Sequence, residues 1–441
     1  MARRSSALAS VAHPPGGVAR RWRPACTGQL DLIMKPRDRA ETTEALQPSP
    51  RDRVSGTRLR DEDASERLAG GHGEGEASPT WIAVSYPAER GSIGLRGDHA
   101  PLSWDETTLP VCSIGDDHLF CVPLHEGELL ELKVVHGDDW ALGRNYVVHA
   151  GDHLRLEPCF HEGPPSFVRD IEIAHGGRTA KIDVLLPPSY EEQPRKRYPV
   201  LYVLDGQSLW THSEDPFGTW GLDGTLGLLY DLGAIEELIV VGIHSSRDRL
   251  SILSPVPDAR YGGGDGPAFL DLVVDGVRAH VNASFRTQTD DASTGILGSS
   301  MGGLFSFFAA WTRPDVFGKA ACLSSSFWWG DRWAVRHVQT SPAPEPRPFF
   351  YLDSGASPSP MEEDGRTTDG FHHTRSMLRA LRRAGFDAGS DIHRLVFPGQ
   401  SHHAAAWASR VALPLQLLFP HVTSPFDFAR WAHVTTTPLL R

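Results

Sequence analysis

The sequence is poor in the features that mark several protein classes. Its five cysteines are an odd number without a CxxC pair, which argues against a disulfide scaffold or a zinc module. Positive charge is in deficit, since 43 Lys and Arg residues stand against 55 Asp and Glu, and a net charge of −12 disfavours nucleic acid as a partner. No apolar run reaches the roughly 18 to 20 residues of a membrane span. These absences predict a protein of a reducing compartment, the cytoplasm, with no metal, no cofactor and no nucleic-acid partner.

The features that are present predict two folded domains that follow an amino-terminal tail. Apolar residues form 40% of the 441, which is enough for sizeable cores. Residues 1–79 are dominated by Pro, Ser, Arg and Gly and lack apolar periodicity, so we expect a disordered tail or an over-long gene start. Residues 7–18 contain two prolines and two glycines and therefore do not form the apolar region of a signal peptide.

Residues 80–162 predict a small β-sandwich. Short alternating runs lie between turn clusters, at Trp81–Val84, His118–Val122, Leu129–Val135 and His153–Glu157. The stretch Gly97–Asp105, followed by Trp140, resembles starch-binding and related immunoglobulin-like modules. That resemblance implies that Trp104 and Trp140 stack on sugar rings. The alternative is that both are half-buried packing residues, and this is the interpretation that we favour.

Residues 163–425 predict an α/β domain with a mostly parallel, doubly wound sheet. Continuous apolar runs such as Val200–Leu204 suit a sheet that is buried on both faces. Strands are expected at Ala180–Leu186, Val200–Asp205, Leu238–Ile243, Thr294–Leu297, Lys319–Leu323, Phe349–Asp353 and Arg394–Phe397. Helices are expected at Thr225–Leu232, Phe269–Val281, Met301–Thr312, Thr374–Ala384 and Ala404–Leu418. Alternation of the two element types is what such a sheet requires.

A GxSxG motif at Gly298–Gly302 lies between an expected strand and an expected helix. This context is that of a nucleophile elbow, in which a sharp turn lifts the serine hydroxyl above the edge of the sheet. The helix behind it supplies backbone N–H groups that can stabilise an oxyanion. The pattern therefore predicts Ser300 as a nucleophile.

A serine hydroxyl needs a base, and the expected chain order is serine, acid, histidine. The segment Ser401–Trp407 follows the last expected strand and precedes the last expected helix, which is the position of such a base. We expect His402 to be the base and His403 to open the helix.

The residues themselves do not select one acid. The loop after Phe349–Asp353 offers several carboxylates, namely Asp353, Glu362, Glu363, Asp364 and Asp369. Asp353 ends a strand, whereas Asp364 and Asp369 each precede a glycine, as turn aspartates often do.

Four segments carry a resemblance to the Putative esterase family, which includes enterochelin (ferric-siderophore) esterases, feruloyl esterases, S-formylglutathione hydrolase and mycolyltransferases. They are Tyr198–Gln207, Gly298–Gly303, Ser326–Trp329 and Ser401–Trp407. The resemblance covers about residues 165–420 and implies an α/β-hydrolase fold. Enterochelin esterases also carry an amino-terminal β-sandwich.

The resemblance also implies roles for individual residues. His402 and Trp407 match the family's histidine segment, while His403 and Ala404 depart from it. An aspartate–glycine pair shortly before a helix makes Asp369 the leading acid and Asp364 the second choice. The oxyanion donors would be the backbone N–H groups of Met301 and of Gln207 or Ser208. Trp328 and Trp329 would line the acyl pocket, the alternative being that they pack in the core. The segment Ile252–Pro255 lacks the family's Glu and Tyr, so a substrate contact there is absent or altered.

The resulting prediction is a serine ester hydrolase of the enterochelin-esterase type, acting on a small-molecule ester or lactone such as a ferric siderophore or an acylated sugar. An acyltransferase or a feruloyl or acetyl esterase on the same scaffold remains open. The alternative to an enzyme is a non-catalytic binding protein with a decayed hydrolase domain.

Overall fold

The computed structural model describes residues 77–160, 165–245, 247–356, 369–421 and 424–425. The expected tail lies outside the described residues up to residue 76, and strand β1 (Ser78–Ser85) begins two residues before the expected boundary. Among these residues, no helix combines the length and the apolar character that crossing a bilayer requires.

The strands between residues 78 and 156, joined by one strand from the carboxyl-terminal end of the described chain, form two sheets that share one core. A five-stranded sheet has the order β17-β8-β1-β4-β3, and a four-stranded sheet joins β2, β5 and β6, with β7 paired to β5. The elements are β1 (Ser78–Ser85), the 3₁₀ turn η1 (Ala88–Arg90), β2 (Ile93–Gly97), β3 (Cys112–Ile114), β4 (Asp117–Leu124), β5 (Leu129–His136), β6 (Asp139–Trp140), β7 (Tyr146–His149), β8 (His153–Leu156) and β17 (Ser424–Pro425). Alternate residues of β1 and β5, among them Ile82, Val84, Leu130 and Leu132, are fully buried in that core.

The two tryptophans of this part form a pair near the surface. Trp140 is 42% exposed, Trp104 is half-buried, and their ring centroids lie 5.9 Å apart. The guanidinium of Arg96 lies 5.2 Å from the Trp140 ring. Both rings thus contact protein groups, and Trp140 also presents a surface to solvent.

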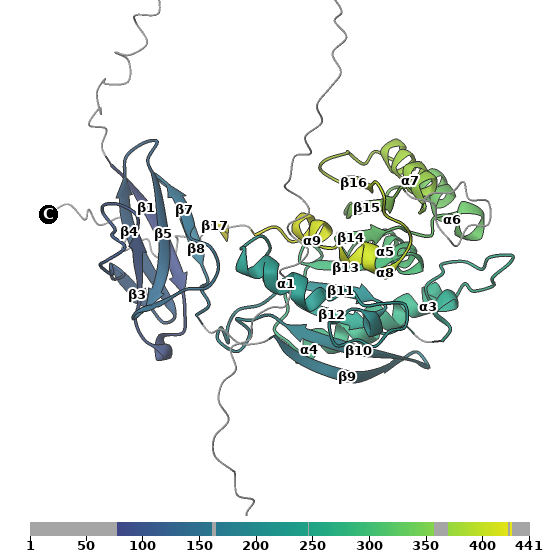
Figure 1. The fold of residues 1–441 in the computed structure, drawn as a ribbon, viewed down its shortest axis with the longest axis horizontal. Helices are drawn as coiled ribbons and strands as arrows, with labels where there is room; N and C mark the ends of the chain where they lie inside the picture. The colour runs from purple at the N-terminus through teal and green to yellow at the C-terminus, as the bar shows by residue number, and fades with distance from the viewer. Residues whose placement is uncertain (1–76, 161–164, 246, 357–368, 422–423, 426–441) are drawn as a thin grey trace, which may run out of the picture. The chain divides into compact units, whose positions relative to one another are not determined.

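The second part is built on an eight-stranded mixed sheet with the order β16-β15-β14-β13-β11-β12-β10-β9 (Figure 1). Its strands are β9 (Ser166–His175), β10 (Arg178–Leu186), β11 (Val200–Leu204), β12 (Ile239–Ile243), β13 (Thr294–Ser299), β14 (Lys319–Leu323), β15 (Phe349–Gly355) and β16 (Ile392–Phe397). Strands β11 to β16 pair in parallel, whereas β10 and β9 are antiparallel. The prediction of a mostly parallel sheet is confirmed.

Helices cover both faces of this sheet, because the central strands β11, β12 and β13 are buried along their whole length. Val200 and Tyr202 of β11 belong to one buried cluster, which also holds side chains of α3, α5, α6 and α7. Leu201 and Val203 belong to the other, which holds side chains of α1 and α9. The helical elements are the 3₁₀ turn η2 (Gly206–Ser208), α1 (Leu222–Asp231), α2 (Arg249–Ile252), α3 (Gly266–Asp271), the π-helix η3 (Leu272–Arg278), α4 (Ala279–Ser284), α5 (Met301–Thr312), α6 (Trp329–Thr340), α7 (Phe371–Arg383), α8 (Ala404–Ala408) and α9 (Ala412–Leu418).

Three features differ from the expectation. Strand β9 is an edge strand whose side chains are mostly exposed, so it lacks the apolar run that identifies a buried strand. Helix α6 was not expected, and Gly330–Arg332 near its start have left-handed backbone angles that interrupt the helical pattern. The single helix expected over Ala404–Leu418 is two short helices, α8 and α9, with Arg410 between them.

Candidate active site

Ser300 lies at the sharp turn between β13 and α5, at the carboxyl edge of the sheet. Its backbone has φ 56° and ψ −118°, a strained conformation for a residue with a side chain. The turn is held by hydrogen bonds of 2.9 Å from the Ser300 N–H to the Leu323 carbonyl and 3.0 Å from the Ser326 N–H to the Ser300 carbonyl. A Cβ atom on Gly298 would lie 2.5 Å from the backbone of Gly302, so the close approach of strand and helix requires glycine at that position.

His402 lies just after β16 and faces the serine hydroxyl. Its Nε2 atom is 2.9 Å from Ser300 Oγ, and its Nδ1 atom is 2.6 Å from Asp369 Oδ1. The Trp407 ring packs edge-to-face against the imidazole at a centroid distance of 5.0 Å. His403 instead caps α8, because its Nδ1 atom accepts a hydrogen bond of 3.2 Å from the Ala406 N–H.

Asp369 is the carboxylate that meets the imidazole. It is fully buried in the loop between β15 and α7, immediately before helix α7. Burial raises the pKa of Asp369, but hydrogen bonds from His402 and Ser324 outweigh burial and hold the pKa below its ordinary value. The carboxyl group is therefore an anion at neutral pH and can orient the imidazole. Asp364, the second choice from the sequence, lies outside the described residues.

Asp353, the third candidate acid, has a different partner. Arg410 Nε and Nη2 lie 3.0 and 2.9 Å from its two carboxylate oxygens, and both side chains are buried. Tyr351 also donates its hydroxyl to Asp353 Oδ2 at 3.1 Å. Burial raises the pKa of Asp353 despite the opposing guanidinium. Its carboxylate is thus occupied by Arg410 and Tyr351.

Two backbone N–H groups, one after strand β13 and one after strand β11, are candidates for an oxyanion hole. Met301 is the first residue of α5, a position at which the helix provides no acceptor for the N–H group. After β11, the Ser208 N–H already donates to the Asp205 carbonyl at 3.0 Å, which favours the Gln207 N–H as the second donor. The Gln207 side chain accepts a hydrogen bond of 3.0 Å from the Ser245 N–H, and this contact holds the loop.

An ion pair anchors the same loop. Asp205 has a left-handed φ of 61°, and its two carboxylate oxygens each lie 2.6 Å from a nitrogen of Arg249. The Ser245 hydroxyl donates to the same carboxylate at 2.6 Å. The loop that carries Gln207 is therefore fixed by side chains from the segment that follows β12.

The two tryptophans expected in the acyl pocket have different environments. Trp329 is 1% exposed, and its indole N–H donates to the Val256 carbonyl at 2.7 Å, so it is a core residue. Trp328 is half-buried and packs edge-to-face against Tyr261, which is 47% exposed. Trp328 follows Ser326, whose hydroxyl is 3.4 Å from Ser300 Oγ. Of the two tryptophans, only Trp328 is partly exposed to solvent.

Sequence reasoning missed Ser324 and Arg410, two buried residues that lie next to Asp369 Oδ2. Ser324 Oγ lies 2.6 Å from Asp369 Oδ2, and Arg410 Nη2 lies 2.6 Å from Ser324 Oγ. The signal in the sequence was the single charge of Arg410 within the apolar run 404–418, because an arginine in such a run is buried only when it is paired.

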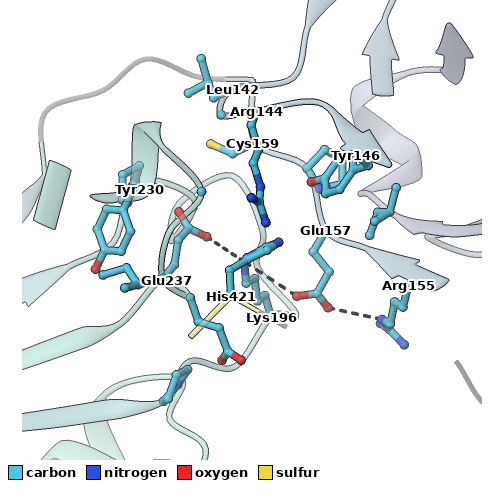
Figure 2. Close-up of a pocket in the computed structure, with 18 of the residues that line it drawn as sticks. Leu142, Arg144, Tyr146, Arg155, Glu157, Cys159, Lys196, Tyr230, Glu237 and His421 are labelled. Atoms are coloured by element: carbon cyan, nitrogen blue, oxygen red, sulfur yellow. Dashed lines mark hydrogen bonds and ion pairs between the residues drawn. The ribbon is translucent and has the colours of Figure 1, made fainter. Parts of the chain in front are cut away.

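A separate pocket of about 520 Å³ does not include the triad (Figure 2). Among its lining residues, Lys196 Nζ and Glu237 Oε2 form a partly buried ion pair at 2.7 Å, and Arg155 Nε lies 3.4 Å from Glu157 Oε1. Within the part of the chain that the structure describes, no group of three or more His, Cys, Asp or Glu side chains could hold a metal ion.

Comparisons with known proteins match the part of the chain that carries this site. Residues 174–414 match the model of a family described as Putative esterase. The chain is 24% identical over 253 residues to "Uncharacterized protein YbbA" of Bacillus subtilis, a match that covers 53% of this chain and 94% of that protein.

Two further relatives are matched over part of their length. Identity is 25% over 250 residues with an "Endo-1,4-beta-xylanase/feruloyl esterase" of Xylanibacter ruminicola, covering 55% of this chain and 30% of that protein. Identity is 29% over 156 residues with a "Siderophore triacetylfusarinine C esterase" of Aspergillus fumigatus, covering 35% of this chain and 53% of that protein.

Proposed function

The chain belongs to the Putative esterase family, and we propose that it is a serine ester hydrolase with Ser300 as nucleophile, His402 as base and Asp369 as acid. The observation that carries the proposal is the continuous contact of these three side chains. Ser300 Oγ lies 2.9 Å from one imidazole nitrogen, and Asp369 Oδ1 lies 2.6 Å from the other. A serine, an imidazole and a buried carboxylate in this order are the parts that acyl transfer requires.

The reaction proceeds in two halves. Ser300 Oγ attacks the ester carbonyl carbon while His402 Nε2 takes the hydroxyl proton, and a tetrahedral oxyanion forms. The oxyanion collapses, the C–O bond to the alcohol breaks, and the alcohol leaves with the proton from His402. Water then attacks the acyl-enzyme, gives a proton to His402, and the acid product leaves as Ser300 regains its proton.

The charges that develop in these steps have partners. The N–H groups of Met301 and Gln207 would donate to the oxyanion, at a helix end whose dipole favours negative charge. The Asp369 carboxylate holds the tautomer of His402 with Nδ1 protonated and stabilises the imidazolium that forms when the serine proton is taken.

The chain would divide into functional parts near the boundaries that its sequence indicates. Residues 163–425 would be the catalytic domain, with an α/β-hydrolase fold. Residues 80–162 would be an immunoglobulin-like or starch-binding-like β-sandwich, and residues 1–79 a tail.

The proposed substrate is a small-molecule ester or lactone with an aromatic acyl group. The rings of Trp328 and Tyr261, whose centroids are 5.8 Å apart, form a partly exposed aromatic pair, and Trp328 lies two residues after Ser326, whose hydroxyl is 3.4 Å from Ser300 Oγ. The names of the relatives add two ester classes, the siderophore and the feruloyl ester. The substrate panel therefore includes esters of both classes.

The test is hydrolysis of a panel of esters by the full chain. We expect release of p-nitrophenol from p-nitrophenyl acetate and butyrate, and faster turnover of a feruloylated sugar or a triscatecholate lactone. The Ser300→Ala variant is the control. Absence of turnover with every ester, with a folded protein, would contradict the proposal and favour a binding protein. Addition of an alcohol acceptor, with analysis of the products, separates hydrolysis from acyl transfer.

A further inference from the structure

The two oxygens of the Asp369 carboxylate have different tasks. Oδ1 faces His402 Nδ1 at 2.6 Å. Oδ2 points away from the imidazole and accepts hydrogen bonds of 2.6 Å from the Ser324 hydroxyl and 2.5 Å from the Gly355 N–H. Because Ser324 and Asp369 are both buried, the hydroxyl contact is shielded from water. The orientation of the carboxylate therefore depends on groups that do not touch the imidazole.

The direction of the Ser324 hydrogen bond is set by Arg410. The Arg410 Nη2 atom lies 2.6 Å from Ser324 Oγ, and a guanidinium can only donate. The single hydroxyl proton of Ser324 is then free to be donated to Asp369 Oδ2. A serine without the arginine could rotate its proton elsewhere.

Arg410 is itself held from three sides. Its Nε and Nη2 atoms contact Asp353 at 3.0 and 2.9 Å, and its Nη1 atom donates to Gln400 Oε1 at 2.6 Å. The guanidinium carbon lies 4.9 Å from the Phe397 ring. These contacts come from β15, from β16 and from the segment after β16, so Arg410 ties together the strand ends that precede Asp369 and His402.

The same contacts keep the positive charge of Arg410 from neutralising the acid. Arg410 Nη2 is 3.8 Å from Asp369 Oδ2, whereas its two-point contact is with Asp353. One guanidinium thus faces two carboxylates and is paired with the one that does not meet the imidazole. The negative charge of Asp369 is therefore available to stabilise the imidazolium. When the imidazolium of His402 forms, two positive groups, His402 and Arg410, face two carboxylates, Asp369 and Asp353.

We propose that Ser324 and Arg410 are positioning residues, which hold the Asp369 carboxylate in the orientation that His402 requires. The inference rests on the proposed function, because it assigns Asp369 to the triad. Ser324 acts directly on Oδ2, and Arg410 acts through Ser324 and keeps its own charge on Asp353.

The test is a double-mutant cycle on the full chain. Ser324→Ala removes the hydroxyl at little change in volume, and we expect kcat to fall about 10- to 100-fold with KM within about twofold, because a loosely held acid misplaces the base. In an Asp369→Asn background, where the carboxylate is already lost, Ser324→Ala should change kcat by less than about twofold. Arg410→Lys, which keeps the charge but loses the planar pair of donors, should behave in the same way.

Ser189→Ala is the matched control. Ser189 is also buried and also donates its hydroxyl to a carboxylate, that of Glu237, but this pair lies outside the proposed catalytic machinery. We expect the kcat of Ser189→Ala, per folded molecule, to equal that of the parent protein. Melting temperatures are recorded for every variant. If Arg410→Lys does not fold, Ser324→Ala decides alone.

The outcomes separate the two proposals. Equal losses from Ser324→Ala in both backgrounds would show that Ser324 does not act through Asp369, which overturns the positioning role and leaves the triad intact. A kcat unchanged by Ser324→Ala would overturn it too. Full activity of Asp369→Asn would instead remove the assigned acid, and both proposals would fall together.

Discussion

The carboxylate of Asp353 meets the guanidinium of Arg410 in a two-point contact, with Nε and Nη2 at 3.0 and 2.9 Å from its two oxygens. Asp353, which lies near the end of strand β15, is therefore part of a buried ion pair, while Asp369, in the loop after this strand, faces the imidazole at 2.6 Å. Two buried aspartates near one histidine thus have distinct partners.

Asp369→Asn is expected to lower kcat by about 10⁴-fold with little change in KM, because the amide cannot stabilise the imidazolium. Asp353→Asn should have a much smaller effect on kcat. It should instead lower the free energy of unfolding by about 3–5 kcal/mol, since it leaves Arg410 buried without its anion. Steady-state kinetics and urea unfolding of both variants make the comparison. A large kcat loss confined to Asp353→Asn would reverse the assignment.

Ser300→Ala is expected to lower kcat by about 10⁴- to 10⁶-fold without affecting the fold, because it removes the hydroxyl that lies 2.9 Å from His402 Nε2 and attacks the ester in the proposed mechanism. Ser299, a buried residue at the end of β13, is the matched neighbour, and Ser299→Ala should retain most of the activity. Mass spectrometry after treatment with a fluorophosphonate should find the adduct on Ser300. Equal losses from both variants would mean that the nucleophile is misassigned.

Trp328→Ala is expected to raise KM for aromatic esters by about tenfold and to leave KM for p-nitrophenyl acetate nearly unchanged, because only an aromatic acyl group uses the ring. Trp329→Ala should behave differently, with a loss of about 3–5 kcal/mol in the free energy of unfolding, since it empties a buried site and leaves the Val256 carbonyl without its donor. Kinetics with both ester types, together with denaturant unfolding, distinguish the two roles. A selective KM effect from Trp329→Ala instead would exchange the assignments.

Asp183 provides a prediction about acid stability. Burial raises its pKa, but hydrogen bonds from His244 at 2.8 Å and from the Asp170 N–H at 2.9 Å outweigh burial and lower the pKa of Asp183 to about 2. A carboxyl whose pKa falls on folding stabilises the protein above its unfolded value of about 3.9, and this stability is lost as the pH falls from about 4 to about 2.

We therefore expect Asp183→Asn to lower the free energy of unfolding at pH 7 by about 2 kcal/mol and to flatten its dependence on pH between about 4 and 2. Urea unfolding of the parent and the variant at several pH values provides the measurement. Parallel curves for the two proteins across that range would contradict the assignment of this acid-sensitive stability to Asp183.

Local sequence patterns were sufficient to predict several strands and some of the candidate site residues. The apolar runs at 200–204 and 239–243 marked buried strands because a sheet covered on both faces needs them, and the sheet is covered on both faces. The glycines around Ser300 marked the turn, since they permit strand and helix to approach. The place of His402 after the last strand predicted it as the base, and His403 caps the next helix as expected. Each of these inferences depends on neighbours within a few positions.

The family resemblance favoured Asp369 among the aspartates, but its contact with the imidazole was visible only in the tertiary structure. The burial of Trp329 and the roles proposed for Ser324 and Arg410 also depended on the tertiary structure. His402 meets Asp369 across 33 residues and Ser300 across 102, and Arg410 meets Ser324 across 86. Such contacts exist only because parallel strands bring their carboxyl ends to one edge of the sheet, where loops distant in sequence converge. Spacing along the chain places several carboxylates in one loop, but the carboxylate that faces the imidazole depends on loop conformation and on the partners already bound by the others.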